Sequence, residues 1–312
     1  MRIGWLGGLL GVLALACGRG KPSVATRAEA YVTTRAPQLA NGSLAILGDD
    51  LGDDVLEAIL ADPRVPALKD LSLGRNRLTA AAVRTIAASP KSAHLRLLAL
   101  DINPVGDQGL VVLSKWFGLT TLEDLMVAHT GATSVGIRAL ASSPHLTSLK
   151  RATFGFQNVG DDGAIALAAL PVREWMHVDS GQIGPAGARA LLSAGHSTSL
   201  SLNNNPIGAG GLATLPAISP TLAGLAMQQT GLGAADAMAL AALAAPALRS
   251  LDLEYNDLGD AGVRALVGAP WFAQLDALDV AYTRASEATY DALRAAWGAK
   301  NGLTAGDGRA AP

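Results

Sequence analysis

Cysteine, aromatic residues and charge are all scarce in this sequence. Cys17 is the only cysteine, so no disulfide can form within the chain. Aromatic residues make up 4% and charged residues 16% of the chain, and the formal net charge is −2. This near-neutral balance argues against electrostatic binding to nucleic acid. Half of the 312 residues are hydrophobic, so we expect stability to come from apolar packing.

Sequence motifs of enzyme chemistry are also missing. There is no HExxH, no CxxC, no GxSxG and no phosphate-binding loop ending in GK[ST]. A faint dinucleotide-type stretch, "GLGAAD" from Gly231, is better explained as a turn that enters a helix. No metal-type spacing links the histidines His94, His129, His145, His177 and His196. We therefore predict a protein without catalytic activity, metal or cofactor.

Long hydrophobic runs are absent except at the start, where residues 3–16 form an apolar run of 14 residues. A membrane-spanning helix needs about 20 residues, so residues 1–16 are typical of a secretory signal peptide. "LALAC" resembles the lipobox of bacterial lipoproteins, in which Cys17 would receive the lipid, although Ala14 stands where Leu is usual. Ordinary cleavage at the Ala-Leu-Ala of residues 14–16 is the alternative. Lipidation would consume the only thiol.

The expected location follows from this start. We expect an exported protein in the cell envelope, anchored to a membrane through Cys17. Gly18 stands where an Asp resembles an inner-membrane retention signal, and this favours the outer membrane. Residues 17–40 are interpreted as a basic tether that ends in an N-terminal cap.

A repeated pattern fills the rest of the chain. Its anchor positions lie 24 to 27 residues apart, at Leu51, Leu78, Val105, Ala132, Val159, Ile183, Ile207, Leu232 and Leu258. Apolar residues stand five and seven positions before each anchor, which is strand alternation, and eight after it, which fits a helix. A tenth, less regular copy has Leu278, Val280 and Tyr282. A fixed period in this range indicates a repeat architecture.

The pattern resembles the leucine-rich repeat family, LxxLxLxxNxL, and most closely its ribonuclease-inhibitor-like branch. "LKDLSLGRNRLTAAAVRTI" and "LRSLDLEYNDLGDAGVRAL" carry the resemblance. It implies an α/β curved horseshoe of nine to ten repeats over residues 41–285, with parallel strands on the concave side and helices on the convex side. We expect a capping helix at 286–300, a disordered tail at 301–312, and a monomer.

A polar residue stands two positions before most anchors, where the chain leaves the strand. The Asn members of this set are Asn76, Asn103, Asn205 and Asn256. A short amide can bond backbone groups that the turn leaves without partners, both locally and in the next repeat. We therefore predict a structural ladder here rather than a catalytic role for Asn256.

Candidate binding residues are those that the strand alternation places outward on the concave face. The middle group consists of His129, Arg151, Phe156, Trp175, His177 and Asp179. The C-terminal group consists of Asp252, Glu254 and Tyr255, with Asp279 and Tyr282 in the tenth copy. Exposed aromatics among polar groups are typical of protein interfaces, and the excess of acids favours a basic partner surface. A chance arrangement remains open, as does an inward position for Trp175 in its shortened repeat.

The leading functional prediction is a non-catalytic module that binds a protein partner on its concave face. A structural element of the envelope without a specific ligand is the alternative. A third possibility follows from the resemblance alone, because this branch includes the GTPase-activating protein of nuclear transport. That possibility requires a cytoplasmic chain, and no residue here matches a catalytic position.

Overall fold

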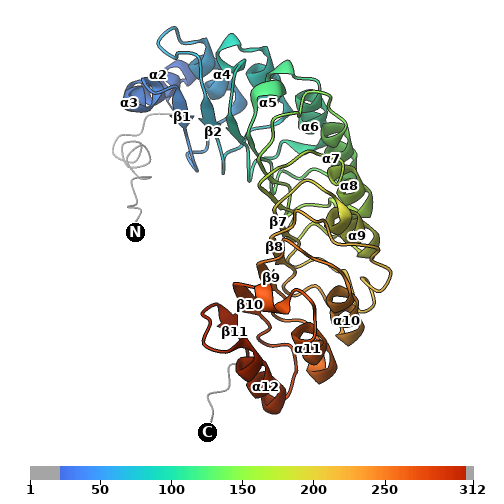
Figure 1. Cartoon of the computed structure of the whole chain (residues 1–312). Helices are drawn as coiled ribbons and strands as arrows, with labels where there is room; N and C mark the ends of the chain where they lie inside the picture. Colours follow the sequence, from blue (N-terminus) through green and yellow to red (C-terminus); the bar gives the residue numbers. More distant parts are fainter. Residues whose placement is uncertain (1–21, 307–312) are drawn as a thin grey trace.

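The fold is one curved parallel sheet covered by helices on its outer side, as seen in a computed structural model that describes residues 22–306 (Figure 1). The eleven strands lie in chain order from β1 to β11, and every pair of neighbours is parallel. The strands line the concave side of the arc and the helices its convex side (Figure 1). This is the α/β horseshoe that the sequence predicts.

Each repeat contributes one very short strand. The register is constant, since Leu71 pairs with Leu98 and Leu98 pairs with Leu125. The strands are β1 (Ser43–Ala45), β2 (Asp70–Ser72), β3 (Leu97–Ala99), β4 (Asp124–Met126), β5 (Arg151–Thr153), β6 (Trp175–His177), β7 (Ser199–Ser201), β8 (Gly224–Ala226), β9 (Ser250–Asp252), β10 (Ala277–Asp279) and β11 (Leu303–Thr304).

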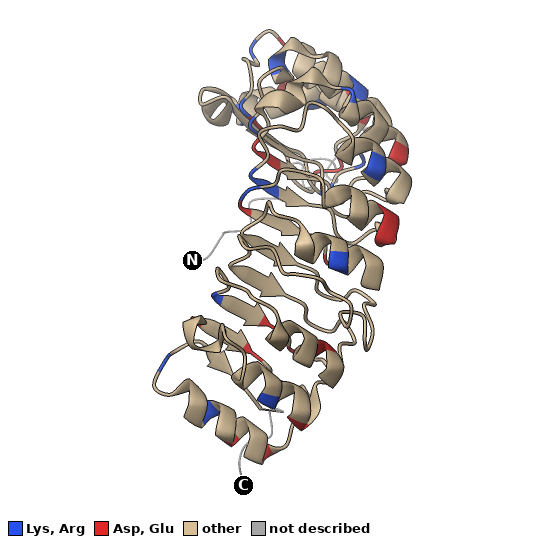
Figure 2. Cartoon of the chain, turned by 45° about the vertical axis from the view of Figure 1, so that its right-hand side comes forward, with Lys and Arg blue, Asp and Glu red and all other residues tan. Residues whose placement is uncertain are grey.

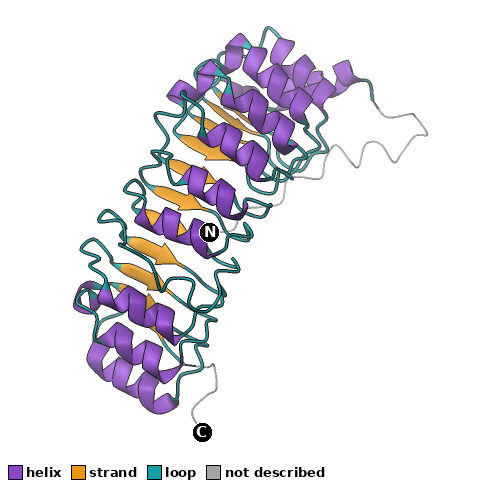
Figure 3. Cartoon of the chain, turned by 90° about the vertical axis from the view of Figure 1, so that its right-hand side faces the viewer, coloured by secondary structure: helices purple, strands orange, loops and turns teal. Residues whose placement is uncertain are grey.

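The helices form a single outer layer over the strands (Figure 3). They are α2 (Val24–Thr34), α3 (Ala36–Leu39), α4 (Asp53–Ala61), α5 (Ala80–Ala88), α6 (Gly106–Ser114), α7 (Ser134–Ala141), α8 (Gly160–Leu167), α9 (Pro185–Ser193), α10 (Ala234–Ala242), α11 (Gly259–Val267) and α12 (Glu287–Trp297). Three short 3-10 turns, η1 (Pro90–Ser92), η2 (Phe117–Thr121) and η3 (Phe272–Gln274), lead back to the strands.

The core lies between the two layers and consists of the repeated apolar positions. In the second repeat, Leu71, Leu73, Leu78, Val83 and Ile86 are all fully buried. Each such side chain contributes roughly 1.5–3 kcal/mol on burial. One repeat has no closed core, so these residues become buried only when neighbouring repeats stack.

The polar position before most anchors is buried and hydrogen-bonded across repeats; the half-buried Asp49 and the glycine at position 181 are the exceptions. Asn76 donates to the carbonyls of Ile46 at 2.8 Å and Leu73 at 2.9 Å, and its Oδ1 accepts from the N–H of Leu51 at 3.1 Å. The same pattern recurs at Asn103, Gln157, Asn205 and Asn256. This is the ladder that the sequence predicts, and it pairs the backbone groups at the end of each strand.

One repeat departs from the expected alternation of strand and helix. Between β7 and β8 the chain forms turns instead of a helix, and Figure 3 shows this stretch as loops. Gly208 and Gly210 have φ angles of 76° and 79°, and Pro216 follows. Because left-handed backbone and proline both oppose a helix, the sequence "IGAGGLATLPA" explains the loss.

The N-terminal end of the sheet is covered by α2 and α3. Ala28, Tyr31 and Val32 of α2 are buried, and the Tyr31 hydroxyl donates to the Asp49 carbonyl at 3.3 Å. The expected cap therefore occupies most of the segment interpreted as a tether. The predicted signal peptide, residues 1–16, and Cys17 lie outside the described residues. No helix in residues 22–306 is long and apolar enough to cross a membrane.

The C-terminal end is closed by α12, whose Tyr290, Leu293 and Trp297 are buried. Beyond it, the expectation of disorder from residue 301 is wrong for residues 301–306. There, β11 pairs with β10, and the carbonyls of Gly302 and Thr304 accept from the sheet at 2.8 and 2.9 Å. The carbonyls of this short segment accept hydrogen bonds from the N–H groups of Leu278 and Val280. The sequence of the tail gave no sign of this extra strand.

Candidate functional site

A row of side chains at one rim of the concave face is set by an unusual backbone shape. In every repeat, the residue three positions before the anchor has a left-handed φ between 50° and 70°. We call these residues the turn row: Gly48, Arg75, Ile102, His129, Phe156, Ser180, Asn204, Gln229, Tyr255 and Tyr282. This backbone costs a non-glycine residue roughly 1–2 kcal/mol.

Hydrogen bonds between repeats hold the turn row in place. The N–H of Phe156 donates to the Asp179 carbonyl at 2.7 Å, and that of Tyr255 donates to the Ala281 carbonyl at 3.1 Å. The next residue in sequence is the ladder residue, such as Asn256 after Tyr255. Its side-chain amide bonds the carbonyls of Leu253 and Glu254 and so holds the same turn. The stacking of repeats therefore imposes the backbone conformation of the turn row. The residue type at each of these positions can vary.

Tyr255 and Tyr282 form the clearest feature of the turn row. Their rings are stacked with centroids 4.6 Å apart and an angle of 4° between the planes. Tyr255 is 51% exposed and Tyr282 is 39% exposed. The pair presents a rigid aromatic surface to solvent, of the kind that protein interfaces use as an anchor.

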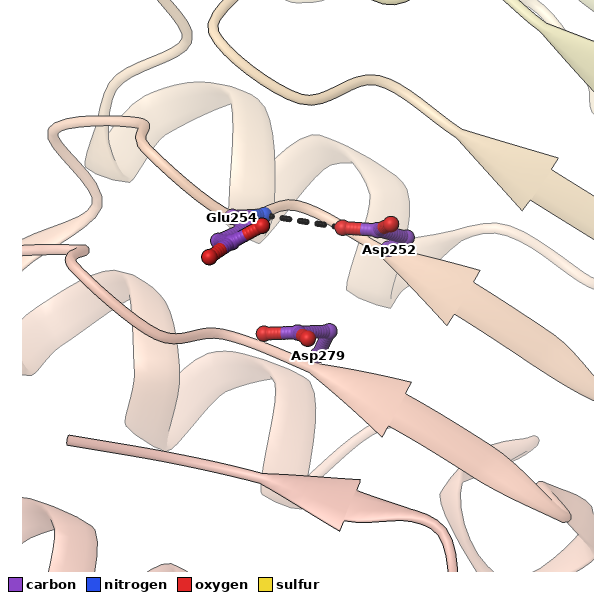
Figure 4. A group of neighbouring side chains, drawn as sticks. All are labelled: Asp252, Glu254 and Asp279. Carbon is purple, nitrogen blue, oxygen red and sulfur yellow. Dashed lines mark hydrogen bonds between the residues drawn. The ribbon is translucent and has the colours of Figure 1, made fainter.

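Three carboxylates lie beside this pair. Asp252 and Glu254 come from the end of β9 and Asp279 from β10, and one oxygen of each lies within 4.8 Å of the others (Figure 4). Asp252 also accepts from the Glu254 N–H at 3.1 Å and from the Gln228 amide at 2.5 Å. No salt bridge joins any of the three to a Lys or Arg within the described residues.

The crowding of like charges changes the acidity of these groups. Burial raises the pKa of Asp252, and the Asp279 charge raises it further, although two donated hydrogen bonds oppose the shift. Burial also raises the pKa of Glu254, with additional repulsion from Asp279 and Asp252. The cluster therefore favours an added positive charge, since a nearby cation would relieve the repulsion.

The cluster is a poor match for a dedicated metal site. Carboxylate oxygens suit Ca²⁺, but that ion takes six to eight oxygen ligands. Among the described residues, this group supplies three carboxylates.

The middle group is only partly brought together. Trp175 and His177 lie on the same face of β6 with ring centroids 4.5 Å apart, and both are half-buried. Trp175 therefore shares the outward face with His177, while Met176 between them is buried in the core.

Two predicted binding residues of the middle group are engaged within the protein. Arg151 makes a bidentate pair with buried Asp124, with both distances 2.5 Å, which raises the pKa of the guanidinium. Asp179 accepts from the Ser201 hydroxyl at 2.5 Å and from the Asn203 N–H at 2.9 Å. These bonds give both residues a structural role. His129 and Phe156 are exposed members of the turn row.

The sequence analysis did not single out two further residues, one on the concave face and one away from it. Asp101 on the concave face is half-buried and accepts from the Ala128 N–H at 2.9 Å, and burial raises its pKa. Phe117 is the most exposed large apolar side chain of the described residues, at 70%. Phe117 lies outside the aligned repeat positions. The only hint in the sequence was the adjacent aromatic pair in "KWFG".

Comparison with known proteins agrees with this architecture. A family model described as a leucine-rich repeat matches residues 245–267. The fold of this chain is that of a leucine-rich repeat solenoid. The chain is similar to NACHT, LRR and PYD domains-containing protein 5 of Bos taurus, with 31% identity over 220 residues. It is also similar to the ribonuclease inhibitor of Sus scrofa, with 29% identity over 246 residues.

The extent of these matches differs between the relatives. The first match covers 64% of this chain and 20% of the relative, and the second covers 72% of this chain and 54% of the relative. Among solved structures, the solenoid is similar to a chain from the crystal structure of the Rad7 and Elc1 complex in yeast. That match has a TM-score of 0.54 and 14% identity, and it covers 91% of the present chain and 76% of the yeast chain. At this identity, the likeness shows the fold.

Proposed function

We propose that the solenoid is a non-catalytic module that binds a protein partner on its concave face. The observation that carries this proposal is the exposed Tyr255–Tyr282 stack beside the carboxylates of Asp252, Glu254 and Asp279. Aromatic surface supplies binding area, and the acids, which form no salt bridge within the described residues, favour a basic partner surface. A relative that is named as a ribonuclease inhibitor supports a protein as the partner.

The scaffold suits this task because it holds the site rigidly. The side chains project from a hydrogen-bonded sheet and from turns fixed by the ladder, so little conformational entropy is lost on binding. Charged residues of both signs are scattered along the solenoid (Figure 2), and the net charge is −2. Selectivity for a basic partner would therefore come from the local cluster rather than from the overall field.

The experiment is affinity capture from native envelopes with matched variants. The Tyr255→Ala, Tyr282→Ala double variant removes the stack, and Met238→Ala on α10 is the control, because Met238 is 47% exposed and belongs to the convex helical layer. We expect one prey protein to be retained by the wild type and the control and lost by the double variant. Equal capture by all three proteins would show that the prey does not bind through the Tyr255–Tyr282 stack.

The middle group gives a second arm of the same experiment. A Trp175→Ala, His177→Ala variant removes the ring pair and leaves the internally bonded Arg151 and Asp179 untouched. We expect it to weaken capture of the same prey when the partner extends along the face. If this variant alone loses the prey, the site lies in the middle of the solenoid and the C-terminal cluster is not the contact.

We further propose that the protein is exported and held at a membrane by a lipid on Cys17. The support is the apolar run of residues 3–16 followed by "LALAC". The test is metabolic labelling with a fatty acid in the native cell, followed by membrane fractionation. Label and membrane association should both be lost in Cys17→Ser. Unchanged fractionation of that variant would contradict the anchor.

A further inference from the structure

An apolar groove opens between the C-terminal ends of α5 and α6, away from the concave face. Its volume is about 720 Å³, and apolar surface dominates its lining. Ala87, Val112 and Trp116 form much of that lining. Trp116 itself is 7% exposed and packs onto Gly118, where a Cβ would collide with the indole ring. The groove therefore has a fixed aromatic wall rather than a mobile one.

Phe117 stands on the rim of this groove. Its 70% exposure is the highest of any large apolar side chain in the described residues. Its ring meets the edge of His145 with centroids 5.6 Å apart, which orients the ring without covering it. Exposed apolar surface of this kind marks interaction sites when it continues into a groove with polar edges.

The charges around the groove have one sign. Arg84 and Lys115 line it, and neither side chain forms an ion pair or hydrogen bond with any described residue. Lys91 nearby is different, since its ammonium donates to the Asp62 carbonyl. Within the described chain, no Asp or Glu is among the lining residues.

We propose that this groove binds an acidic amphipathic helix of a protein partner. Apolar side chains of that helix would fill the space between α5 and α6 and pack on Trp116 and Phe117. Carboxylates on the helix flanks would pair with Arg84 and Lys115. A groove between two helices accepts a ridge of side chains at i, i+3, i+4 and i+7 spacing. The hollow shape favours a helix over the flat surface of an anionic bilayer.

This site is independent of the concave-face function, because it lies on other elements and selects the opposite charge. The probe is a short stapled helical peptide with leucines along one face and glutamates on the flanks, labelled with a fluorophore. Binding to the solenoid is measured by fluorescence anisotropy. A peptide with lysines in place of the glutamates is the charge control, and we expect it not to bind.

Variants then locate the contact. Arg84→Glu combined with Lys115→Glu should weaken binding of the acidic peptide by about tenfold or more, which corresponds to about 1.4 kcal/mol. Phe117→Ser should also weaken it. Arg138→Glu, which occupies the position of Arg84 two repeats later and does not line the groove, should leave the affinity unchanged. Circular dichroism melts check that all variants remain folded.

Three outcomes would overturn the proposal. The first is no binding of the acidic peptide, and the second is equal affinity for the wild type and the double charge variant. The third comes from flotation with vesicles of phosphatidylglycerol. If the wild type floats, the charge variant does not, and the peptide fails to bind, the groove contacts lipid instead of a helix.

Discussion

At the scale of single residues, the ladder amides connect sequence to stability most directly. Asn103 is 2% exposed and donates to the carbonyls of Leu73 and Leu100, each at 2.9 Å. Its Oδ1 accepts from the N–H of Leu78 at 3.0 Å. One side chain thus completes backbone bonds in two repeats, and its loss would leave buried groups without partners.

Replacing Asn103 by Ala should therefore lower the free energy of unfolding by about 2–3 kcal/mol, since each unsatisfied buried group costs about 1–3 kcal/mol. Urea denaturation followed by circular dichroism gives the value. Asn41→Ala is the control, because the exposed Asn41 amide makes only one long bond of 3.4 Å. The structural ladder would be contradicted by an equal, small effect of both substitutions.

The acid cluster gives a prediction about pH. The pKa of Asp252 and that of Glu254 are raised in the folded state, so folding is penalised as pH rises through the carboxylate range. Glu254→Gln removes one charge, and the Glu254 carboxylate accepts no hydrogen bond from the described residues. This variant should be more stable than the wild type at neutral pH by roughly a few tenths of a kcal/mol.

The gain should vanish at about pH 3, below the usual carboxylate pKa values, where both proteins are protonated at this site. Chemical denaturation at the two pH values measures it. A variant that is less stable than the wild type at neutral pH would mean that the carboxylate is held by an attraction rather than by repulsion.

The sequence predicted some residues of the site well and others less so. Asp252, Glu254 and Tyr255 come from one strand end and Asp279 and Tyr282 from the next, so the repeat period alone placed them together. Arg151 and Asp179 were predicted as binding residues, yet their partners Asp124, Ser201 and Asn203 lie in neighbouring repeats. Strand alternation predicts on which face of the sheet a side chain lies. It does not predict the hydrogen bonds and ion pairs that the side chain forms there.

At the scale of elements, the stretch between β7 and β8 is the weak point of the convex layer. It has turns in place of a helix, and Gly208 and Gly210 carry left-handed backbone. The neighbouring helices α9 and α10 therefore lack a helix between them to pack against. The period of the apolar residues continues through this repeat, which is why the sequence pattern predicted a helix there.

Hydrogen exchange should reveal this difference. Amides of residues 208–217 should exchange faster than those of α8 and α11, because turns with exposed residues open at lower free energy than packed helices. Exchange followed by mass spectrometry measures protection by segment. Equal protection of the turns and of both helices would contradict this prediction, because it would mean that residues 208–217 open no more easily than the helices.

The strands are packed without such a gap, and a single buried charge should disrupt several of them. Leu202 follows β7, is fully buried and lies near the middle of the stack. Leu202→Asp should cost more than about 4 kcal/mol, because an unpaired carboxylate would replace apolar packing. We expect several repeats to unfold together in a thermal melt. A melting temperature equal to that of the wild type would refute the assigned repeat positions.

At the scale of the whole molecule, the repeat pattern predicted the architecture because each repeat contacts chiefly its neighbours. Period, strand face and helix face then define the curved stack. The ends were less predictable, since a cap has no repeated neighbour to reveal it. Thus α2 and α3 were interpreted mainly as tether, and β11 fell in a tail expected to be disordered. The convex groove at Trp116 and Phe117 was missed because both residues lie outside the aligned repeat positions.

Site-specific photo-crosslinking in the native cell distinguishes binding on the concave face from binding on the convex face. A photoreactive phenylalanine analogue is placed at position 255 on the concave face or at position 238 on the convex face. We expect one protein with a basic contact surface to be captured at position 255 and not at position 238. Capture of the same proteins at both positions, or none at 255, would contradict concave-face binding.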